Sequence, residues 1–377
     1  MGWPFLSWII MPRLFLWNWK LGSFPLRLYV RRVYGWPVGV PKPFFRRPAL
    51  VLFLLLFLLS CAGDEVLDLA LKPPERRQID LGRMGVNNFF VHRNMASVQG
   101  QFDIVKNAIG LRHVRVLFAW TDGIQPAPNV EPDYSFYDEI VSSIPDGVDV
   151  VAVVAHAPSW FVDPSSWRGR NPREAWVEQW LEPVVRRYSD APGILAWEVW
   201  NEPDLALSAA DGVLGLEIPS NYVDLLMGAV SVLRSASPSK MVVMAATRSI
   251  QQNFPQTLDY NKELRDLGVE DLVDVWNVHY YGEQFSKLVQ ENGVSDFLNS
   301  LRLPIWITES GETGFTGQLA YVETVWPFLR EKVPSIERIY YYEFASDAPE
   351  QENYGLFAAW APFEPSDLCI YLNESAR

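Results

Sequence analysis

The sequence of 377 residues is poor in the residues that build disulfide frameworks and metal centres. It contains two cysteines, Cys61 and Cys369, so no network of disulfide bonds holds the fold together. No two of its four histidines are spaced as H-x-H or H-E-x-x-H, which argues against a metal hydrolase. The G-x-G-x-x-G motif of a doubly wound sheet is also absent. We therefore expect no metal site, and we expect Cys369 to be a buried thiol.

Acidic residues are missing from the first 60 positions, which hold eight lysines and arginines. Residues 61–377 carry 24 basic and 45 acidic side chains, a net charge of −21. A body this acidic would repel the phosphate backbone that supplies most of the affinity for nucleic acids. We expect no nucleic-acid partner. With 49% hydrophobic residues, the composition is that of a globular protein.

An export signal is predicted at residues 1–60. Basic residues precede an apolar run of eleven residues, 49–59, which as a helix would be about 16 Å long and too short to span a membrane. The run has the length of a signal-peptide core. Leu58-Leu59-Ser60-Cys61 resembles the lipobox of bacterial lipoproteins, in which Cys61 would carry the lipid. We expect an exported bacterial protein, anchored by this lipid to the membrane or cell envelope, with residues 61–79 as a tether.

Two alternatives to this interpretation of the N-terminus stay open. The alternatives are an ordinary secretory signal, giving a secreted protein, and a membrane anchor to which Cys61 is incidental. Residues 1–40 are rich in Trp and Pro, and no Met lies between Met11 and Met84. We therefore hypothesise that translation starts near Val38 or Val40 and that the segment upstream is not part of the protein.

From residue 80, short apolar or β-branched runs alternate with amphipathic stretches, the order typical of parallel strands joined by helices. The candidate strands are 84–91, 113–120, 148–155, 194–200, 241–246, 273–279, 304–308 and 339–344. Eight strands in this length predict a single (β/α)8 barrel, a TIM barrel, over residues 80–377.

One helix has a start that can be located from the sequence. Asn171, Pro172 and Glu174 predict an N-cap, a proline at the first helical position and a capping box. The stretch that follows carries apolar residues at helical spacing. They are Trp176, Trp180, Leu181, Val184 and Val185.

Glutamates stand at the ends of the fourth and seventh candidate strands. Glu202 lies between Asn201 and Pro203, and Glu309 follows Thr308. Catalytic residues of a barrel lie at these strand ends. Glycoside hydrolysis requires two carboxyl groups, one protonated to release the leaving oxygen and one ionised. A retaining enzyme holds the two carboxyl groups about 5–5.5 Å apart, a distance at which a covalent intermediate can form. At this distance each carboxylate raises the pKa of the other.

This pattern resembles the retaining glycoside hydrolases of clan A, the four-seven superfamily. Asn201-Glu202-Pro203 and Glu309 carry the resemblance, which extends over most of the chain from residue 80. Four further segments resemble elements of the clan: Pro158-Ser159-Trp160, 134–138, His279-Tyr280-Tyr281-Gly282 and 353–357. Within the clan, the likeness is greatest to families 39 and 5.

The resemblance implies an enzyme that hydrolyses O-glycosyl bonds with retention of configuration and needs no cofactor. It assigns Glu202 as the general acid/base and Glu309 as the nucleophile. Asn201 resembles the residue that binds the sugar 2-hydroxyl. Arg115 matches an arginine that keeps the nucleophile ionised, and a purely structural salt bridge is the alternative.

The same resemblance implies contacts for two residues after the sixth strand. Tyr281 would donate a hydrogen bond to the nucleophile, and His279 would contact the sugar or a carboxylate. A structural position for either is the alternative. His156 ends the third strand and is a further candidate for substrate binding, whereas we assign His92 and His113 to structure.

Aromatic residues after the strands are candidates for stacking on sugar rings. Trp160 follows the third strand and Trp120 the second. Many clan members end the eighth strand with a Trp beneath the sugar, but this chain has Tyr340-Tyr341-Tyr342-Glu343-Phe344. We expect Tyr342 or Phe344 to take that place.

The substrate is expected to be a poly- or oligosaccharide outside the cytoplasm. The net charge of −21 opposes an acidic glycan, so a neutral β-glycan such as a glucan, mannan or xylan is favoured. Loops 121–135, 203–220 and 345–362 would determine linkage and endo or exo action.

Two other functions are alternatives to this one. A surface glycan-binding lipoprotein on the same barrel is the main alternative, although binding alone does not require both glutamates, Asn201 and Arg115. An aldolase would need a lysine at a strand end, and none of the eight strand ends has one.

Replacing Cys61 by Ser should release the protein from membranes and leave its activity unchanged, because only the lipid would be lost. Fractionation of cells followed by immunoblotting checks this. Continued membrane retention would assign the attachment to the segment upstream of Cys61.

Overall fold

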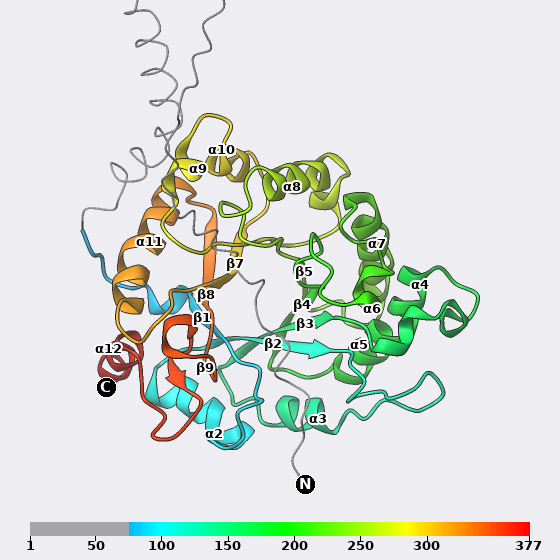
Figure 1. Cartoon of the computed structure of the whole chain (residues 1–377), viewed down its shortest axis with the longest axis horizontal. Coiled ribbons are helices and arrows are strands. Elements are labelled where there is room, and N and C mark those ends of the chain that lie inside the picture. Colours follow the sequence, from blue (N-terminus) through cyan, green and yellow to red (C-terminus); the bar gives the residue numbers. More distant parts are fainter. Residues whose placement is uncertain (1–74) are drawn as a thin grey trace, which may run out of the picture. The chain divides into compact units, whose positions relative to one another are not determined.

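Eight parallel strands form a barrel in this computed structural model, which describes residues 75–377 (Figure 1). The strands are β1 (Met84–Asn87), β2 (His113–Ala119), β3 (Asp149–Ala155), β4 (Ile194–Val199), β5 (Met241–Met244), β6 (Trp276–His279), β7 (Ile305–Ser310) and β8 (Ile336–Tyr341). They pair in the order β5-β4-β3-β2-β1-β8-β7-β6. A parallel bridge between Val243 and Val275 joins β5 to the segment before β6 and closes the ring. The (β/α)8 barrel expected from the sequence is thus confirmed.

Helices follow the strands and surround the barrel (Figure 1). The α-helices are α2 (Val98–Asp103), α3 (Ser135–Ser142), α4 (Pro172–Trp176), α5 (Glu182–Tyr188), α6 (Ala209–Gly212), α7 (Pro219–Ala236), α8 (Gln256–Asp266), α9 (Phe285–Val289), α10 (Val294–Asn299), α11 (Gln318–Lys332) and α12 (Asp367–Ser375). Shorter elements are the π-helices η2 (Ile104–Ala108) and η5 (Val177–Leu181) and the 3-10 helices η1 (Leu81–Arg83), η3 (Ser159–Val162), η4 (Pro164–Trp167), η6 (Val269–Asp271) and η7 (Glu350–Glu352). Two short strands, β9 (Ala345–Ser346) and β10 (Phe357–Ala358), pair with each other after β8.

The expectations for the N-terminus, which are the export signal, the translation start and the lipid on Cys61, lie outside the described residues. Within residues 75–377, no helix is both long enough and apolar enough to cross a membrane. The described end of the expected tether packs on α11. The backbone N–H of Arg77 donates to the Glu323 carbonyl at 2.9 Å, and its side chain pairs with Glu331 at 2.8 Å.

Three strands, β1, β6 and β8, differ by three residues or more from the predicted bounds, and β6 begins at Trp276 and not at residue 273. β1 ends at Asn87 and not at residue 91, and Phe90 then has a left-handed backbone with φ of 56°. β8 begins three residues earlier than predicted. The prediction missed this start because Glu337 and Arg338 interrupt the apolar pattern of the strand. The Arg338 guanidinium group lies 4.7 Å from the centre of the Trp306 ring, so a charged residue is accommodated inside the strand by an aromatic face.

The helix start predicted at Asn171 is confirmed. The Asn171 side chain accepts hydrogen bonds from the N–H groups of Arg173 and Glu174, and the Glu174 side chain accepts one in return, which completes the capping box. From this start α4, η5 and α5 run on as one helical segment. Its five predicted core residues are buried: Trp176, Trp180, Leu181, Val184 and Val185.

Cys369 lies in α12 and is 3% exposed. Burial raises the pKa of its thiol to about 12, so the thiol is protonated and unreactive at neutral pH. The expectation of a buried thiol is confirmed.

A small apolar cluster fills the interior of the barrel. It contains Tyr340, Trp306 and valines from β3 and β5. Gly85 in β1 faces this cluster. A Cβ atom at Gly85 would lie 2.3 Å from the Tyr340 ring, so only glycine leaves room for the aromatic side chain there.

Replacing Gly85 by Ala should lower the free energy of unfolding by about 1–3 kcal/mol, because the added methyl group overpacks the barrel against Tyr340. Urea unfolding checks this. Gly228→Ala is the matched control, since its Cβ would make only an ordinary contact of 3.6 Å with Val177, and alanine is favoured in a helix. Equal stability of the two variants would show that Tyr340 does not fill this space.

Candidate active site

Arg115 lies in the middle of β2 and is the centre of a buried network. Its Nε and Nη2 atoms each donate to one oxygen of Glu198 at 2.8 Å. Its Nη1 atom donates to Glu309 at 2.6 Å and to Asn87 at 3.0 Å. Its Nη2 atom also donates to Asn201 at 2.7 Å. A guanidinium group has five N–H bonds, so these five hydrogen bonds use all of them and fix its orientation.

Glu198 is a site residue that the sequence analysis missed. It lies inside β4, is fully buried, and accepts a third hydrogen bond from Asn277 at 3.0 Å. The Glu198–Arg115 pair is a structural salt bridge, and the same guanidinium group also contacts Glu309. The function of the contact with Glu309 stays a prediction. The sequence signal for Glu198 is its position within an apolar strand. A carboxylate buried there needs a buried cation as its partner.

Glu309 lies near the end of β7 and has two hydrogen-bond donors. Arg115 donates to Oε1 at 2.6 Å, and the Tyr281 hydroxyl donates to Oε2 at 2.9 Å. Burial raises the pKa of Glu309, but the charges of His279 and Arg115 and these hydrogen bonds outweigh it and lower the pKa below its ordinary value. Glu309 is therefore held as a carboxylate.

Glu202 stands three residues after β4 and is more open than Glu309, with 19% of its side chain exposed. Its backbone is left-handed, with φ of 45°, and its N–H donates to the Ala246 carbonyl at 2.9 Å. One carboxylate oxygen of Glu202, one of Glu309 and a ring nitrogen of His279 all lie within 4.8 Å of one another. The structure thus brings the two predicted glutamates together at the carboxyl ends of β4 and β7.

His279, at the end of β6, lies between these carboxylates. Its Nδ1 atom is 3.0 Å from Glu202 and 3.7 Å from Glu309. Burial lowers the pKa of His279, but the charge of Glu309 and the hydrogen bond to Glu202 outweigh it and raise the pKa. The two carboxylates thus stabilise the imidazolium form. The three side chains have the donor atoms of a cation site, but a metal would require the neutral imidazole and would face the Arg115 charge.

The chain after β8 contributes Tyr342, whose ring packs edge-on against Tyr281 at 6.3 Å and Tyr354 at 6.0 Å. Phe344 is 1% exposed and packs against Phe357 at 5.4 Å. The expectation of a sugar contact at Phe344 is corrected, because its ring has no free face. Of the two alternatives, Tyr342 is the one that contacts Tyr281, whose hydroxyl donates to Glu309.

Glu343 is a second carboxylate that the sequence analysis did not identify as a site residue. It is 9% exposed. Burial raises its pKa to about 8, and the charges of Glu309 and Asp347 act in the same direction. A protonated carboxyl group therefore lies near Glu309 at neutral pH.

The two tryptophans predicted as sugar platforms differ in exposure. Trp120 is fully buried and stacks on Trp180 with ring centres 5.8 Å apart. Its assignment as a platform is corrected, because aromatic core residues cover it. Trp160 is half-buried, packs edge-on against Trp120 at 5.2 Å and donates from Nε1 to the Gln125 carbonyl. Trp160 keeps the exposed surface that a platform needs.

The other histidines have partners other than the two glutamates. His156 follows β3, and its Nδ1 atom is 3.4 Å from Asp211 on α6. His113 contacts the Gly82 carbonyl at 3.2 Å and Asp149 at 3.4 Å. Burial lowers the pKa values of His92 and His113, as suits structural residues.

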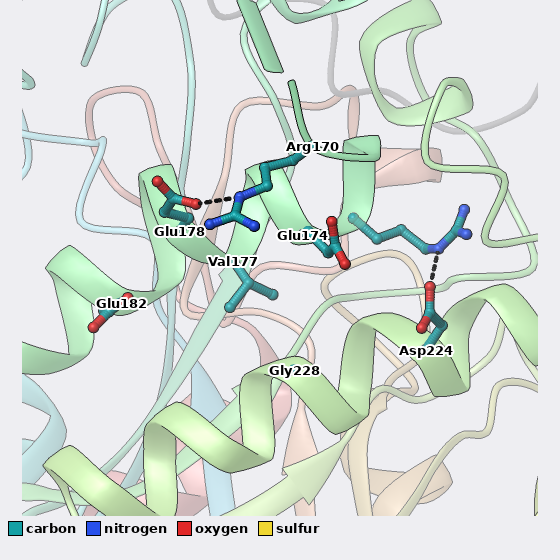
Figure 2. A pocket seen from close by; sticks show the side chains of 8 residues that line it. Arg170, Glu174, Val177, Glu178, Glu182, Asp224 and Gly228 are labelled. Atoms are coloured by element: carbon teal, nitrogen blue, oxygen red, sulfur yellow. Dashed lines mark hydrogen bonds and ion pairs between the residues drawn. The ribbon is translucent and has the colours of Figure 1, made fainter. Parts of the chain in front are cut away.

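A groove of about 450 Å³ lies elsewhere, between the α4–α5 segment and α7 (Figure 2). Four of its charged side chains are paired with one another, Arg170 with Glu178 at 3.2 Å and Arg173 with Asp224 at 2.8 Å. Glu174 and Glu182 have partners outside the groove, the Asn171 N–H and Arg186. None of the predicted site residues lines it. The groove lacks the unpaired polar groups that a specific ligand site requires.

The model of the family Cellulase (glycosyl hydrolase family 5) matches residues 82–342. No curated protein matches the chain. Among solved structures, the chain is similar to a family 39 glycoside hydrolase from Bacteroides cellulosilyticus WH2, with a TM-score of 0.56 and 17% identity over 80% of this chain and 64% of that one. It is also similar to a β-galactosidase from Marinomonas ef1, with a TM-score of 0.55 and 16% identity over 78% and 59%.

A β-xylosidase of family 39 from Caulobacter crescentus is similar as well, with a TM-score of 0.56 and 15% identity over 79% of this chain and 72% of that one. At these identities the structures agree in fold. The chain spans 64% and 59% of the length of the first two proteins.

Replacing Tyr281 by Phe should raise the pKa of Glu309 by about one unit, because a hydrogen bond to the ionised form is lost. Titration of ¹³C-labelled glutamate carboxyl groups by NMR checks this, with Glu309→Gln to assign the signal. Tyr371→Phe on α12 is the matched control and should leave the titration unchanged. An unchanged pKa in Tyr281→Phe would show that the hydroxyl does not stabilise the carboxylate.

Proposed function

The chain belongs to glycosyl hydrolase family 5 and is a glycosidase of clan A, and we propose that it is a retaining β-glycoside hydrolase with Glu309 as nucleophile and Glu202 as general acid/base. One observation carries this proposal: oxygens of the two carboxyl groups lie within 4.8 Å of each other. Retaining enzymes hold the groups about 5–5.5 Å apart, whereas inverting enzymes separate them by roughly 6.5–9.5 Å to admit a water molecule. The short separation favours double displacement.

The surroundings of the two glutamates support different roles. Glu309 accepts hydrogen bonds from Arg115 and Tyr281, which keep it ionised and aim it at the anomeric carbon. Glu202 has one contact of this kind, to His279 at 3.0 Å, and keeps some exposure. A carboxyl group with fewer donors and access to solvent is the better candidate for repeated proton transfer.

In the first step of the proposed reaction, a Glu309 oxygen bonds to the anomeric carbon as the glycosidic C–O bond breaks. Glu202 gives its proton to the leaving oxygen, so the aglycone departs as a neutral alcohol. In the second step, Glu202 takes a proton from water, whose oxygen replaces Glu309 at the anomeric carbon. Two inversions give net retention, and both carboxyl groups return to their starting protonation states.

Asn201 is the residue proposed to bind the sugar that lies beside Glu202 and Glu309. Its Oδ1 atom accepts from Arg115 Nη2 at 2.7 Å. Because arginine has no acceptor, the amide oxygen must face Arg115, and the NH₂ group remains to donate. This arrangement supports the contact with the sugar 2-hydroxyl.

A neutral β-glycan outside the cytoplasm is the proposed substrate. The loop after β8 is acidic, with Asp347, Glu350 and Glu352, and Glu312 follows β7. These charges near the carboxyl ends of the strands would repel a polyuronate. Export and lipid attachment at Cys61 belong to the same proposal.

The purified protein should release reducing ends from at least one neutral β-glycan in a panel of glucans, mannans and xylans, and ¹H NMR should show the β-anomer as the first product. Glu309→Gln should abolish release, whereas Glu331→Gln on α11, which is exposed, should not. Binding of a glycan without release would favour the glycan-binding lipoprotein, and hydrolysis of polyuronates alone would overturn the neutral substrate.

Glu202→Ala should slow the hydrolysis of natural glycans by about 10²–10⁴-fold, because their alcohol leaving groups need protonation. Activated aryl glycosides should lose far less in the first step. Parallel kinetics on both kinds of substrate check this. Equal losses would show that Glu202 is not the acid. For Glu309→Ala, azide should restore turnover and give the inverted glycosyl azide.

A further inference from the structure

His156 borders the active site on the side of β4. It is the first residue after β3, and its backbone is left-handed, with φ of 66°. Its carbonyl accepts a hydrogen bond from Trp176 Nε1 at 2.8 Å, which fixes this conformation. Its ring lies edge-on to Trp200, with ring centres 5.8 Å apart, and Trp200 is two residues before Glu202. The ring is thus held beside the strand that carries the acid/base.

Asp211 approaches His156 from α6, in the loop between β4 and α7. It is 6% exposed, and each of its carboxylate oxygens has its own partner. Oδ1 accepts from the Ala157 N–H at 3.1 Å, and Oδ2 lies 3.4 Å from His156 Nδ1. The Asp211 N–H donates to Ser208 Oγ at 3.0 Å. The carboxylate is therefore fixed at both ends and has little freedom to turn away.

This contact determines which nitrogen of a neutral His156 carries the proton. A carboxylate offers only acceptors, so the proton must be on Nδ1, and Nε2 is left with a lone pair. The hydrogen bonds among residues 75–377 that involve the His156 ring use Nδ1, and 15% of the side chain stays exposed. Nε2 is thus available as an acceptor for a group from outside the protein.

We propose that Asp211 is a positioning residue: it holds His156 in the Nδ1–H tautomer so that Nε2 accepts a hydrogen bond from a hydroxyl group of the bound sugar. This inference rests on the proposed glycosidase function. The short helix α6 would then have a function: the Ser208 cap fixes the start of the helix, and the helix carries Asp211 to its contact with His156.

The variant Asp211→Asn makes a sharp test because the two oxygens of Asp211 have different partners. The Ala157 N–H needs an acceptor, which only the amide oxygen of Asn can supply. The NH₂ group of Asn then faces His156 Nδ1 and donates to it. His156 should therefore change to the Nε2–H tautomer and lose its acceptor on the side of the sugar.

The ¹⁵N shifts of the histidine side chains measure the tautomer directly. The chain has four histidines, so long-range ¹H–¹⁵N spectra of the ¹⁵N-histidine-labelled protein at pH 8.5 are simple, and His156→Gln identifies the His156 signals. The parent should show the Nδ1–H form, and Asp211→Asn the Nε2–H form. An Nε2–H form in the parent, or no change in Asp211→Asn, would overturn the proposal.

Kinetics on the hydrolysed glycan test the sugar contact. Asp211→Asn should raise KM about tenfold, the effect of one lost hydrogen bond, and change kcat less. Ser208→Ala is the matched control, because it loosens the same helix but keeps the carboxylate. It should retain the Nδ1–H form and the parental KM.

Other outcomes separate the possible failures. A KM for Ser208→Ala as high as that for Asp211→Asn, or a changed tautomer with an unchanged KM, would overturn the sugar contact. Since the tautomer is measured without substrate, the absence of hydrolysis by the parent would refute the proposed function and leave the result on Asp211 and His156 standing.

Discussion

The five hydrogen bonds of the Arg115 guanidinium group are the constraint on which the rest of the site depends. A buried arginine requires carboxylates that compensate its charge. Glu198, fully buried in β4, supplies one with two parallel hydrogen bonds, and this bidentate pair fixes the plane of the guanidinium group. The remaining N–H bonds then point to Asn87, Glu309 and Asn201. A structural salt bridge thus sets the direction in which the Glu309 carboxylate and the Asn201 amide are held.

The same network makes two chemically identical side chains different. Glu309 receives hydrogen bonds from Arg115 and Tyr281 and has its pKa lowered. The Glu202 carboxylate has a hydrogen-bond contact with His279 alone among residues 75–377 and lies partly open to solvent. His279 contacts both carboxylates from a fully buried position, so its charge is part of the balance between them. Their different environments suit the different roles that we propose for the two carboxyl groups.

The fold and the pair of glutamates were predictable because each has a local signal. Buried apolar runs mark the strands, and Asn201-Glu202-Pro203 with Glu309 marks the strand ends. Residues that act through packing gave weaker signals. Trp120 was predicted to be exposed by its place after β2, yet the helix that carries Trp180 covers it, and no local pattern shows which helix covers which ring. Asp211 is 55 positions from His156, so only the folded chain brings the two together.

Left-handed backbone conformations show how the barrel holds these side chains in place. His156, Trp200 and Glu202 have φ values of 66°, 76° and 45°, each of which costs about 1–3 kcal/mol for a residue with a Cβ atom. The strain occurs at the carboxyl ends of β3 and β4, where the chain must turn these three side chains toward the candidate active site. Buried hydrogen bonds hold the turns: Trp176 Nε1 donates to the His156 carbonyl, and the N–H groups of Trp200 and Glu202 donate to the carbonyls of Val154 and Ala246. Because these partners belong to β3, the end of β5 and the helix beginning at Asn171, the packed barrel itself stabilises the conformations that the chemistry needs.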